Sequence, residues 1–587
     1  MLARMVRHER SALPPRRAHR LATIGALALA VLVGCAPTPA GGPRPAGRSS
    51  VDRPATTLDI AVRYEPESLA SVPLRDTGSG VSSTTRLFNA QLDMQDGKSE
   101  PRPYLAEALP QLNTDSWRVF PDGRMETTYH LRQGLTWQDG APLSADDFAF
   151  AWAVYSTPAF GLADSPPLKQ MEGVDAPDPR TVIIRWRETY PDAGALAMNF
   201  QALPKHLLEE PFGRMDAEAF VAQSFWTTDY VGLGPYRIQR WEPGALLVGT
   251  AFEGHVLGRP KIERVIVHFF ADENVAFTNL LSGEVEYATG RALRFEHGTT
   301  LQKDWGDGAR GTVLFTPDTS RFMAAQFRPD LVSPRDLLDP RVRRALVSSI
   351  DRDALNEAMF EGHGDMSDIF LTRYSRYERV PDMDATIARA QQTIAHYPYD
   401  ERKTAGYMSD AGYTRNRDGA FVNAGGERFS MEVWNHASPQ YGKELAVIVD
   451  TWNKVGFDAR PNVLPAAALR DGKLRSSFPA LYIASSSRLE SFTQAAIPTD
   501  ANRWSGSNRG SWVNPAYEEL WTAFNSTLDP DQRREQIIGM LRLLNDELPA
   551  WVLYYNPSVA AFQSVLKGPD NASLNTDVWN IYDWEMR

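Results

Sequence analysis

Residues 104–152 read YLAEALPQLNTDSWRVFPDGRMETTYHLRQGLTWQDGAPLSADDFAFAW and carry turn, strand and helix signals in close succession. The Asp-Gly pairs at 122–123 and 139–140 favour tight turns, because glycine adopts a positive φ without steric cost. Residues 127–131, TTYHL, are a β-rich run. Ser144 precedes two acidic residues and an apolar run, a pattern typical of a helix N-terminus. These signals predict structure and carry no catalytic chemistry of their own.

Strand and helix patterns alternate along the rest of the chain. Residues 58–64, 181–186 and 262–269 are further β-rich runs. Helix starts are predicted where Asp339 and Asp529 each precede a proline and a run with helical periodicity. No repeat of fixed period interrupts this order. The pattern therefore predicts an α/β or α+β protein with mixed sheets.

Length and composition exclude several classes of protein. A chain of 587 residues exceeds what one hydrophobic core serves, about 250–300 residues, so two or more lobes are expected. With 43% hydrophobic and 23% charged residues it is neither a disordered chain, a collagen nor a polytopic membrane protein. The net charge of −11 argues against nucleic-acid binding, because it repels a phosphate backbone. A single cysteine excludes a disulfide framework and cysteine-based metal sites.

The N-terminus reads as a bacterial export signal. Basic residues 16–20, RRAHR, precede an apolar run of 13 residues at 21–33, which is shorter than the ~20 that span a bilayer. The sequence LVGC at 32–35 resembles the lipobox at which bacterial lipoproteins are cleaved. That resemblance implies that Cys35 becomes the acylated N-terminus of the mature protein. The alternative is a free, buried thiol that follows an apolar run by coincidence.

We therefore assign residues 1–34 to a signal peptide and 35–56 to a flexible tether rich in proline, glycine and small polar residues. The signal peptide holds six arginines and one glutamate, so cleavage takes the net charge from −11 to −16. So acidic a protein is not held electrostatically at an anionic membrane, and the lipid has to anchor it.

Six blocks, in order along the chain, resemble one protein family. Residues 104–152 resemble the signature block of the extracellular solute-binding proteins of family 5, the peptide and nickel receptors of ABC importers. The other five blocks are VGLGPYRI (231–238), GRPKIERVIVHFFADENVAFTNLLSGEVEYA (258–288), DPRVRRALVSSIDRDAL (339–355), YDERKTAGYMSDAGY (399–413) and WVNPAYEEL (512–520). Collinear matches of this extent are far more specific than any single motif.

The resemblance implies a two-lobed α/β fold like that of periplasmic binding proteins of class II. Mixed β-sheets would be flanked by helices, an extra subdomain would be inserted, and the ligand cleft would lie between the lobes. Lobe I is placed at 57–86, 187–288 and 556–587, the inserted subdomain at 87–186, and lobe II at 289–555. The hinge strands are expected near Ala288 and Asn556.

The family's pattern also implies which residues line the cleft. Carried onto this chain they are Tyr64, Asn89, Phe322, Gln326, Trp434, Asn435, Ser485, Arg488 and Trp504. Aromatic side chains bury a large area at low entropic cost, and amides and hydroxyls add directional hydrogen bonds. Core packing is the alternative for each aromatic. Trp434 is the strongest candidate, because it lies near the end of an alternating strand, just before a polar turn.

One position departs from the family pattern. The resemblance places an aspartate that pairs with a peptide's α-ammonium where this chain has Ser485. A buried ammonium without a charge partner costs several kcal/mol to desolvate. Arg488 adds positive charge nearby, although Glu490 could substitute for the missing acid. We therefore expect neutral, N-blocked or anionic solutes, such as modified peptides, opines or oligosaccharides, to bind better than free-amine peptides.

No catalytic residues, metal site or cofactor are predicted. The sequence lacks the phosphate-binding loop G-x-x-x-x-G-K-[ST], the H-E-x-x-H metal motif and the G-x-S-x-G elbow. His436, beside Trp434, is interpreted as a solvated loop residue in preference to a ligand contact. Arg341, Arg343 and Arg344 could form a ligand clamp, but surface or helix-terminal ion pairs are the preferred interpretation.

The predicted function is that of a lipid-anchored, extracytoplasmic receptor, in the periplasm or at the cell surface. Its partners would be a small-molecule or peptide ligand, the permease subunits of an ABC importer and, through Cys35, the membrane. A monomer is expected, with no nucleic-acid partner. The alternatives are a ligand-sensing lipoprotein without transport and a lipid-anchored hydrolase.

Overall fold

The computed structural model describes residues 56–74, 82–196, 199–306, 308–372, 382–465, 468, 471–486, 488–502, 504–570 and 577–587. The predicted signal peptide, Cys35 and all but the last residue of the predicted tether lie outside these residues. These described residues form one compact unit.

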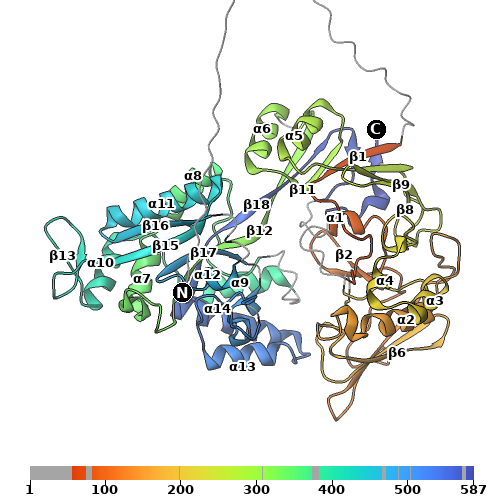
Figure 1. Cartoon of the computed structure of the whole chain (residues 1–587), viewed down its shortest axis with the longest axis horizontal. Helices are drawn as coiled ribbons and strands as arrows, with labels where there is room; N and C mark the ends of the chain where they lie inside the picture. Colours follow the sequence, from red (N-terminus) through yellow and green to blue (C-terminus); the bar gives the residue numbers. More distant parts are fainter. Residues whose placement is uncertain are drawn as a thin grey trace, which may run out of the picture. The chain divides into compact units, whose positions relative to one another are not determined.

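A ten-stranded mixed sheet runs through this unit (Figure 1). In order across the sheet its strands are β16 (Asp458–Leu464), β15 (Ser430–His436), β17 (Leu481–Ser486), β12 (Gly311–Ala325), β18 (Ala550–Gln563), β11 (Tyr287–Leu293), β1 (Thr57–Val62), β10 (Arg264–Phe269), β9 (Leu246–Ala251) and β8 (Tyr236–Glu242). The pairings β16–β15, β15–β17, β11–β1 and β1–β10 are parallel, and the other pairings are antiparallel.

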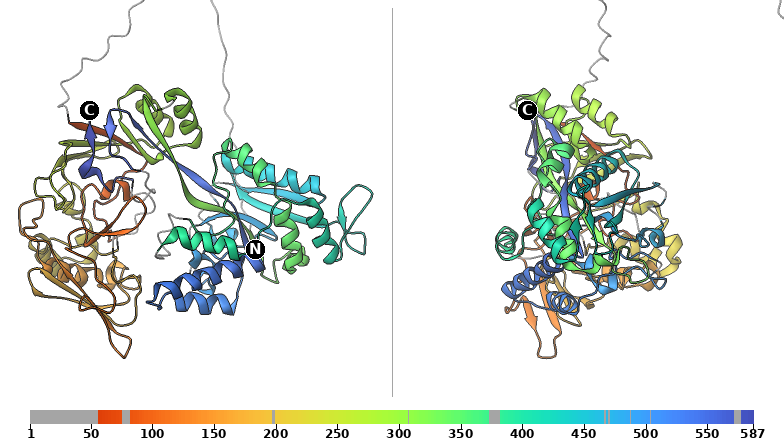
Figure 2. Two further views of the ribbon diagram at one scale, coloured as in Figure 1. Left: turned by 180° about the vertical axis from the view of Figure 1, so that it is seen from behind. Right: turned by 90° about the vertical axis from the view of Figure 1, so that its left-hand side faces the viewer.

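Two long strands, β12 and β18, join the halves of this sheet, and Figure 2 shows them running side by side. Their register shifts between the pairs Pro317–Pro557 and Ser320–Tyr555. Before the shift the strands pair in the half that contains β11 and β1, and after it in the half that contains β17 and β15. Asn556, near which a hinge strand is expected, lies at this irregularity within β18.

A second sheet lies within the predicted insertion at 87–186. It has four antiparallel strands in the order β4 (Trp117–Val119), β5 (Met125–His130), β7 (Thr181–Trp186) and β6 (Met171–Asp178). Three two-stranded ladders complete the strands: β2 (Asp93–Gln95) with β3 (Pro101–Pro103), β13 (Thr414–Arg415) with β14 (Phe421–Val422), and β19 (Leu566–Lys567) with β20 (Glu585–Met586).

Helices alternate with strands along the chain. They are α1 (Ser82–Thr85), α2 (Ala145–Tyr155), α3 (Lys205–Arg214), α4 (Ala217–Val221), α5 (Glu273–Ser282), α6 (Phe295–Trp305), α7 (Pro340–Ser348), α8 (Arg352–Phe360), α9 (Met383–Thr393), α10 (Glu401–Asp410), α11 (Pro439–Val455), α12 (Gly472–Arg475), α13 (Pro515–Phe524) and α14 (Pro530–Glu547). Helix α11 packs on β15 and β16, and α14 packs on β18.

The local signals in the sequence predicted these elements well. Strand β7 has the predicted bounds, and α2 begins after Ser144, whose backbone N–H donates to Asp147 at 2.9 Å. Asp339 and Asp529 are the N-caps of α7 and α14, and each carboxylate accepts from a backbone N–H at 2.8 Å. Gly123 and Gly140 have φ of +87° and +93°, so the predicted Asp-Gly turns are confirmed.

Separate hydrophobic cores support the halves of the large sheet. One core joins β1, β8, β9 and β10 with the four-stranded sheet and includes Ile60, Val265, Tyr129 and Trp186. Two others cover the opposite faces of the half built on β15 and β17, one with Val433 and Leu445, the other with Phe322 and Tyr482. The half of the sheet that contains β15 and β17 is thus buried on both faces. Polar side chains are therefore expected where its strands end.

Candidate functional site

The candidate site lies at one edge of the sheet, where β15 and β17 end. These strands are parallel, so their carboxyl ends meet at the same edge. Antiparallel β12 brings Arg321 opposite Ser485 and Ser320 opposite Ser486 at this edge. Ligands of open α/β sheets bind outside the carboxyl ends of the strands. The topology thus gathers side chains from three separate parts of the chain.

Arg321 is the centre of this edge, although its side chain is only 3% exposed. Its Nε and Nη2 atoms donate to the two carboxylate oxygens of Glu444, on α11, at 3.1 and 2.5 Å. Nη2 also donates to Asn435 Oδ1 at 3.3 Å, and Nη1 donates to Ser485 Oγ at 2.8 Å. The guanidinium lies 4.0 Å from the ring centroid of Tyr441. Such a bidentate pair, with further bonds, holds the arginine in one geometry.

The surroundings of Arg321 favour the charged form of its guanidinium. Burial by itself would lower the pKa of Arg321, but the Glu444 carboxylate outweighs burial, so the pKa lies above its ordinary value. Glu444 has a fully buried side chain and also accepts from Asn435 Nδ2 at 2.9 Å. Burial raises the pKa of Tyr554 well above its usual range, and Glu444 adds to that shift. Arg321 therefore carries its charge at physiological pH.

The predicted contacts Asn435 and Ser485 are brought together by this network. Asn435 is fully buried and bridges Arg321 to Glu444 and to the Tyr441 backbone. Ser485 is exposed at the end of β17. Sequence reasoning missed Arg321, Glu444 and Tyr441. Only the acidic and aromatic character of the helix that follows β15 was visible in the sequence, and nothing in it pointed to β12.

Trp434 and Phe322 lie on the other face of the same strands. Phe322 is buried in the core that contains Phe492 and Tyr482, whereas Trp434 is half-buried at the margin of that core. The Trp434 indole N–H donates to Glu432 Oε2 at 2.8 Å. As ligand contacts both residues stay predictions, and Trp434 is the more accessible of the two.

The interpretation of His436 as a solvated loop residue is wrong. It is the last residue of β15 and only 3% exposed. Its Nε2 lies 2.7 Å from the Tyr482 hydroxyl, which also accepts from Arg475 Nε at 3.1 Å. Burial, with Arg475, Arg321 and Arg509 nearby, lowers the pKa of His436 to about 4. The imidazole is therefore neutral, and it shares a hydrogen bond with the Tyr482 hydroxyl through Nε2.

Gln326 lies at the far end of the paired strands from Ser485. Its backbone N–H donates to Ala480, and its carboxamide donates to the carbonyls of Phe478 at 2.7 Å and Ser476 at 3.4 Å. The side chain is fully buried. These bonds give Gln326 a structural role, and a ligand contact there stays a prediction.

The predicted contacts from the first part of the chain, Tyr64 and Asn89, lie outside the strands of the large sheet. Asn89 is buried, and its carboxamide donates to the carbonyls of Leu69 and Thr85 at 2.6 and 2.7 Å and accepts from Gln201 at 2.8 Å. Tyr64, which follows β1, is 42% exposed, and the Arg63 guanidinium lies 5.3 Å from its ring centroid.

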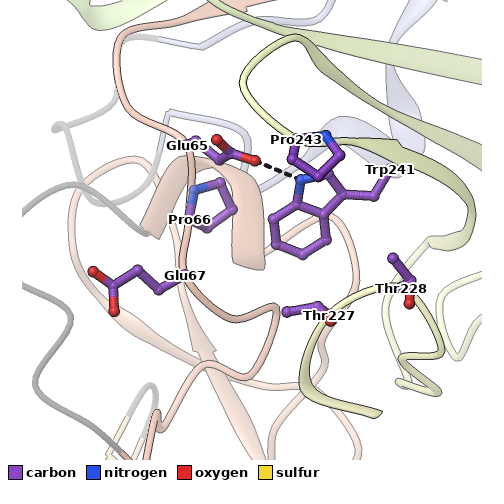
Figure 3. Close-up of a pocket in the computed structure, with 7 residues that line it drawn as sticks. All are labelled: Glu65, Pro66, Glu67, Thr227, Thr228, Trp241 and Pro243. Carbon is purple, nitrogen blue, oxygen red and sulfur yellow. Dashed lines mark hydrogen bonds between the residues drawn. The ribbon is translucent and has the colours of Figure 1, made fainter. Parts of the chain in front are cut away.

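Directly after Tyr64 the chain lines a pocket of about 390 Å³ (Figure 3). In this pocket Glu65 Oε1 accepts from the Trp241 indole at 2.7 Å, and Oε2 accepts from the Gly244 N–H at 2.9 Å. Both carboxylate oxygens are thus used to hold the β8–β9 turn against the segment after β1.

Arg488 and Trp504 follow β17. Arg488 is 48% exposed and 3.7 Å from Glu490, and both line a pocket of about 820 Å³ together with Glu188, Asp192 and Trp521. Trp504 donates its indole N–H to Asp500 at 2.8 Å, and Lys473 lies 5.3 Å from its ring centroid. Glu490 therefore stands beside Arg488 rather than beside Ser485 in this structure.

The arginine clamp is not supported by the contacts of these side chains. Arg341 pairs with Asp339 at 2.6 Å, as the ion-pair interpretation expected. Arg343 and Arg344 instead donate to backbone carbonyls at the end of α14. Among the described residues, no group of three or more histidine, cysteine, aspartate or glutamate side chains is placed to hold a metal ion. In that same part of the chain, no helix has the length and apolar character required to cross a bilayer.

Comparison with known proteins decides the family. Residues 107–502 match the family described as bacterial extracellular solute-binding proteins, family 5 Middle. The chain belongs to this family. The resemblance drawn from the six sequence blocks is thereby confirmed, and family 5 proteins act outside the cytoplasm.

Relatives of this family 5 protein match over most of their length. It is 20% identical to the oligopeptide-binding protein AppA of Bacillus subtilis, over 92% of this chain and 93% of AppA. It is also 20% identical to the dipeptide-binding protein of Escherichia coli, over 83% of this chain and 87% of that protein.

Solved structures share the fold at low sequence identity. CtaP of Listeria monocytogenes, an ABC transporter substrate-binding protein, matches with a TM-score of 0.70 at 18% identity, over 90% of this chain and 99% of CtaP. NikA of Brucella suis, solved in complex with Fe(III)-EDTA, has a TM-score of 0.70 at 15% identity, over 90% and 100% of the two chains. The predicted two-lobed α/β fold is thus confirmed.

Proposed function

We propose that this family 5 protein is a lipid-anchored receptor that captures a small solute by closing its two lobes and delivers it to the permease of an ABC importer. The observation that carries this proposal is the match to family 5 over residues 107–502, in a chain whose fold is shared along nearly its whole length. The names of relatives, oligopeptide-binding and dipeptide-binding proteins, support a peptide-like or similarly sized solute.

We propose the same lobe boundaries that were predicted from the sequence. Lobe I comprises 57–86, 187–288 and 556–587, lobe II comprises 289–555, and the subdomain at 87–186 is inserted between parts of lobe I. The carboxyl edge of β15 and β17 supplies the wall from lobe II, with Trp434, Asn435 and Ser485 as its proposed solute contacts. The receptor works as a monomer, without a cofactor or metal.

The anchor is proposed to be a lipid on Cys35. It is supported by the 13-residue apolar run and the LVGC sequence that precede the tether. The proline- and glycine-rich tether would let the folded body reach a permease in the same membrane.

The direct test is to identify the solute. Native mass spectrometry of gently purified full-length protein should detect a bound small molecule. Adding that molecule at a hundredfold excess over its Kd should stabilise the native state by about 2.7 kcal/mol, and small-angle scattering should show compaction. Turnover of peptidase, esterase or glycosidase substrates that is lost on mutation of a single acid or serine would refute the receptor function and favour the hydrolase.

A further inference from the structure

The strand end at Ser485 combines an exposed hydroxyl with a buried cation. Ser485 is exposed as β17 ends, while the Arg321 guanidinium behind it is 3% exposed and donates to Ser485 Oγ at 2.8 Å. The serine was expected to leave this position without any charge. The structure instead places a guanidinium in direct contact with the hydroxyl.

Arg321 cannot turn away from this contact at low cost. Three of its five N–H groups are held by Glu444 and Asn435, and its flat face lies against the Tyr441 ring. Reorienting it would leave the fully buried Glu444 carboxylate without its bidentate partner, which is strongly unfavourable. The Nη1 atom is therefore held in place beside Ser485.

This contact decides the direction of the Ser485 hydrogen bond. A hydroxyl has one hydrogen to donate and two lone pairs to accept with. Since Arg321 donates to Ser485 Oγ, the serine hydrogen points elsewhere, and among the described side chains no acceptor takes it. A hydroxyl that accepts from a cation is also a stronger donor, because hydrogen bonds in a chain polarise one another.

We propose that Arg321 determines solute specificity by making the Ser485 strand end a hydrogen-bond donor, so that the bound solute presents a carbonyl or carboxylate oxygen there and not an ammonium group. The inference rests on the proposed receptor function and names the chemistry at one point of its cleft. Arg321 acts through Ser485 and is thus a positioning residue.

The same geometry explains why restoring an acid would not restore ammonium binding. An aspartate at position 485 would lie within reach of Arg321 Nη1 and pair with that guanidinium. Its charge would then be partly offset inside the protein, by a guanidinium that it shares with Glu444. We expect Ser485→Asp to gain less than tenfold in affinity for a free-amine peptide.

The first test uses the pKa of a thiol at position 485 to detect the positive charge of Arg321, in the absence of any solute. Because Cys35 is the only cysteine, the full-length variant Cys35→Ser with Ser485→Cys carries a single thiol. A thiolate beside a guanidinium is stabilised relative to an ordinary thiol of pKa about 8.5. The rate of alkylation by iodoacetamide, followed against pH, should have its midpoint at least one pH unit below that of a control thiol at exposed Ser409 in the same Cys35→Ser background.

A midpoint equal to or above that of the Ser409→Cys control would overturn the inference. Circular dichroism and the melting temperature of both variants establish that they are folded. The thiol midpoint reports the charge that position 485 experiences and does not depend on the overall stability of the fold.

The second test compares solutes that differ in one group. Trialanine and N-acetyl-trialanine present an ammonium and a carbonyl, respectively, at the same end. Native mass spectrometry of an equimolar mixture should show at least tenfold preference for the acetylated peptide. Equal or tighter binding of the free-amine peptide would overturn the inference while leaving the receptor function standing. By contrast, enzymatic turnover would refute the receptor function and leave the thiol measurement valid.

Discussion

The guanidinium of Arg343, near the start of α7, donates two hydrogen bonds to the backbone carbonyl of Glu547, the last residue of α14, at 2.7 and 2.8 Å. A third bond goes to the Leu337 carbonyl at 2.7 Å, and the side chain is 3% exposed. Burial lowers the pKa of Arg343 to about 10, so it still carries its charge at neutral pH. A cation at a helix C-terminus satisfies carbonyls that have no partner within the helix.

We expect Arg343→Met to destabilise the protein by about 2–4 kcal/mol, because it removes the donor to the buried Leu337 carbonyl and to the half-buried Glu547 carbonyl. Urea denaturation followed by tryptophan fluorescence measures the change. Arg344→Met is the matched control: Arg344 is half-buried and donates to the Asp546 carbonyl at 3.2 Å, a longer bond than those of Arg343, so its loss should cost less than about 1 kcal/mol. Equal effects of the two substitutions would contradict this role.

Acid should destabilise the protein through two buried histidines. Burial lowers the pKa of His255 to about 4, and the pKa of His436 is also lowered to about 4, by burial and then by Arg475. In the unfolded chain both would titrate near 6.5. The unfolded state thus binds more protons between these values, so stability is complete above pH about 6.5 and is lost as the pH falls toward 4.

The slope should be about 1 kcal/mol per pH unit for each histidine near the middle of this range. Replacing His255 or His436 by glutamine should flatten the dependence of the unfolding free energy on pH between 4 and 6.5. His130→Gln, at an exposed position, should leave the slope as it is. Unchanged slopes in both buried variants would show that other groups govern acid unfolding.

Trp434→Ala should weaken binding of the co-purified solute by about 5- to 150-fold, since loss of a large aromatic contact costs about 1–3 kcal/mol at a binding site. Trp241→Ala is a close match: both indoles are half-buried and donate to a carboxylate at 2.7–2.8 Å, but Trp241 is on β8. Calorimetric titration of the two variants compares them directly. Intact affinity in Trp434→Ala would remove this residue from the proposed wall.

Cys35→Ser should release the protein from the membrane fraction, because a single lipid site is the proposed anchor. Intact mass spectrometry of the wild-type membrane fraction should show an acylated N-terminal Cys35. A wild-type protein cleaved at another bond, or full membrane retention of Cys35→Ser, would contradict lipid anchoring.

Sequence alone determined the local features and the family. The Asp-Gly turns and the N-caps Ser144, Asp339 and Asp529 were predictable because a few adjacent residues suffice to favour them. The fold was predictable because motifs in a fixed order identify the family even where overall identity to its relatives is about 20%.

The tertiary structure decided which polar groups meet. Arg321 contacts Glu444 and Ser485, which are 123 and 164 residues away in sequence, and no local pattern joins them. His436 reads as a solvated turn residue, yet it is buried because Tyr482 comes to lie beside it on the neighbouring strand. Burial and hydrogen-bond direction depend on strand order and register, and these are set by the packing of the whole sheet between its cores rather than by any short run of residues.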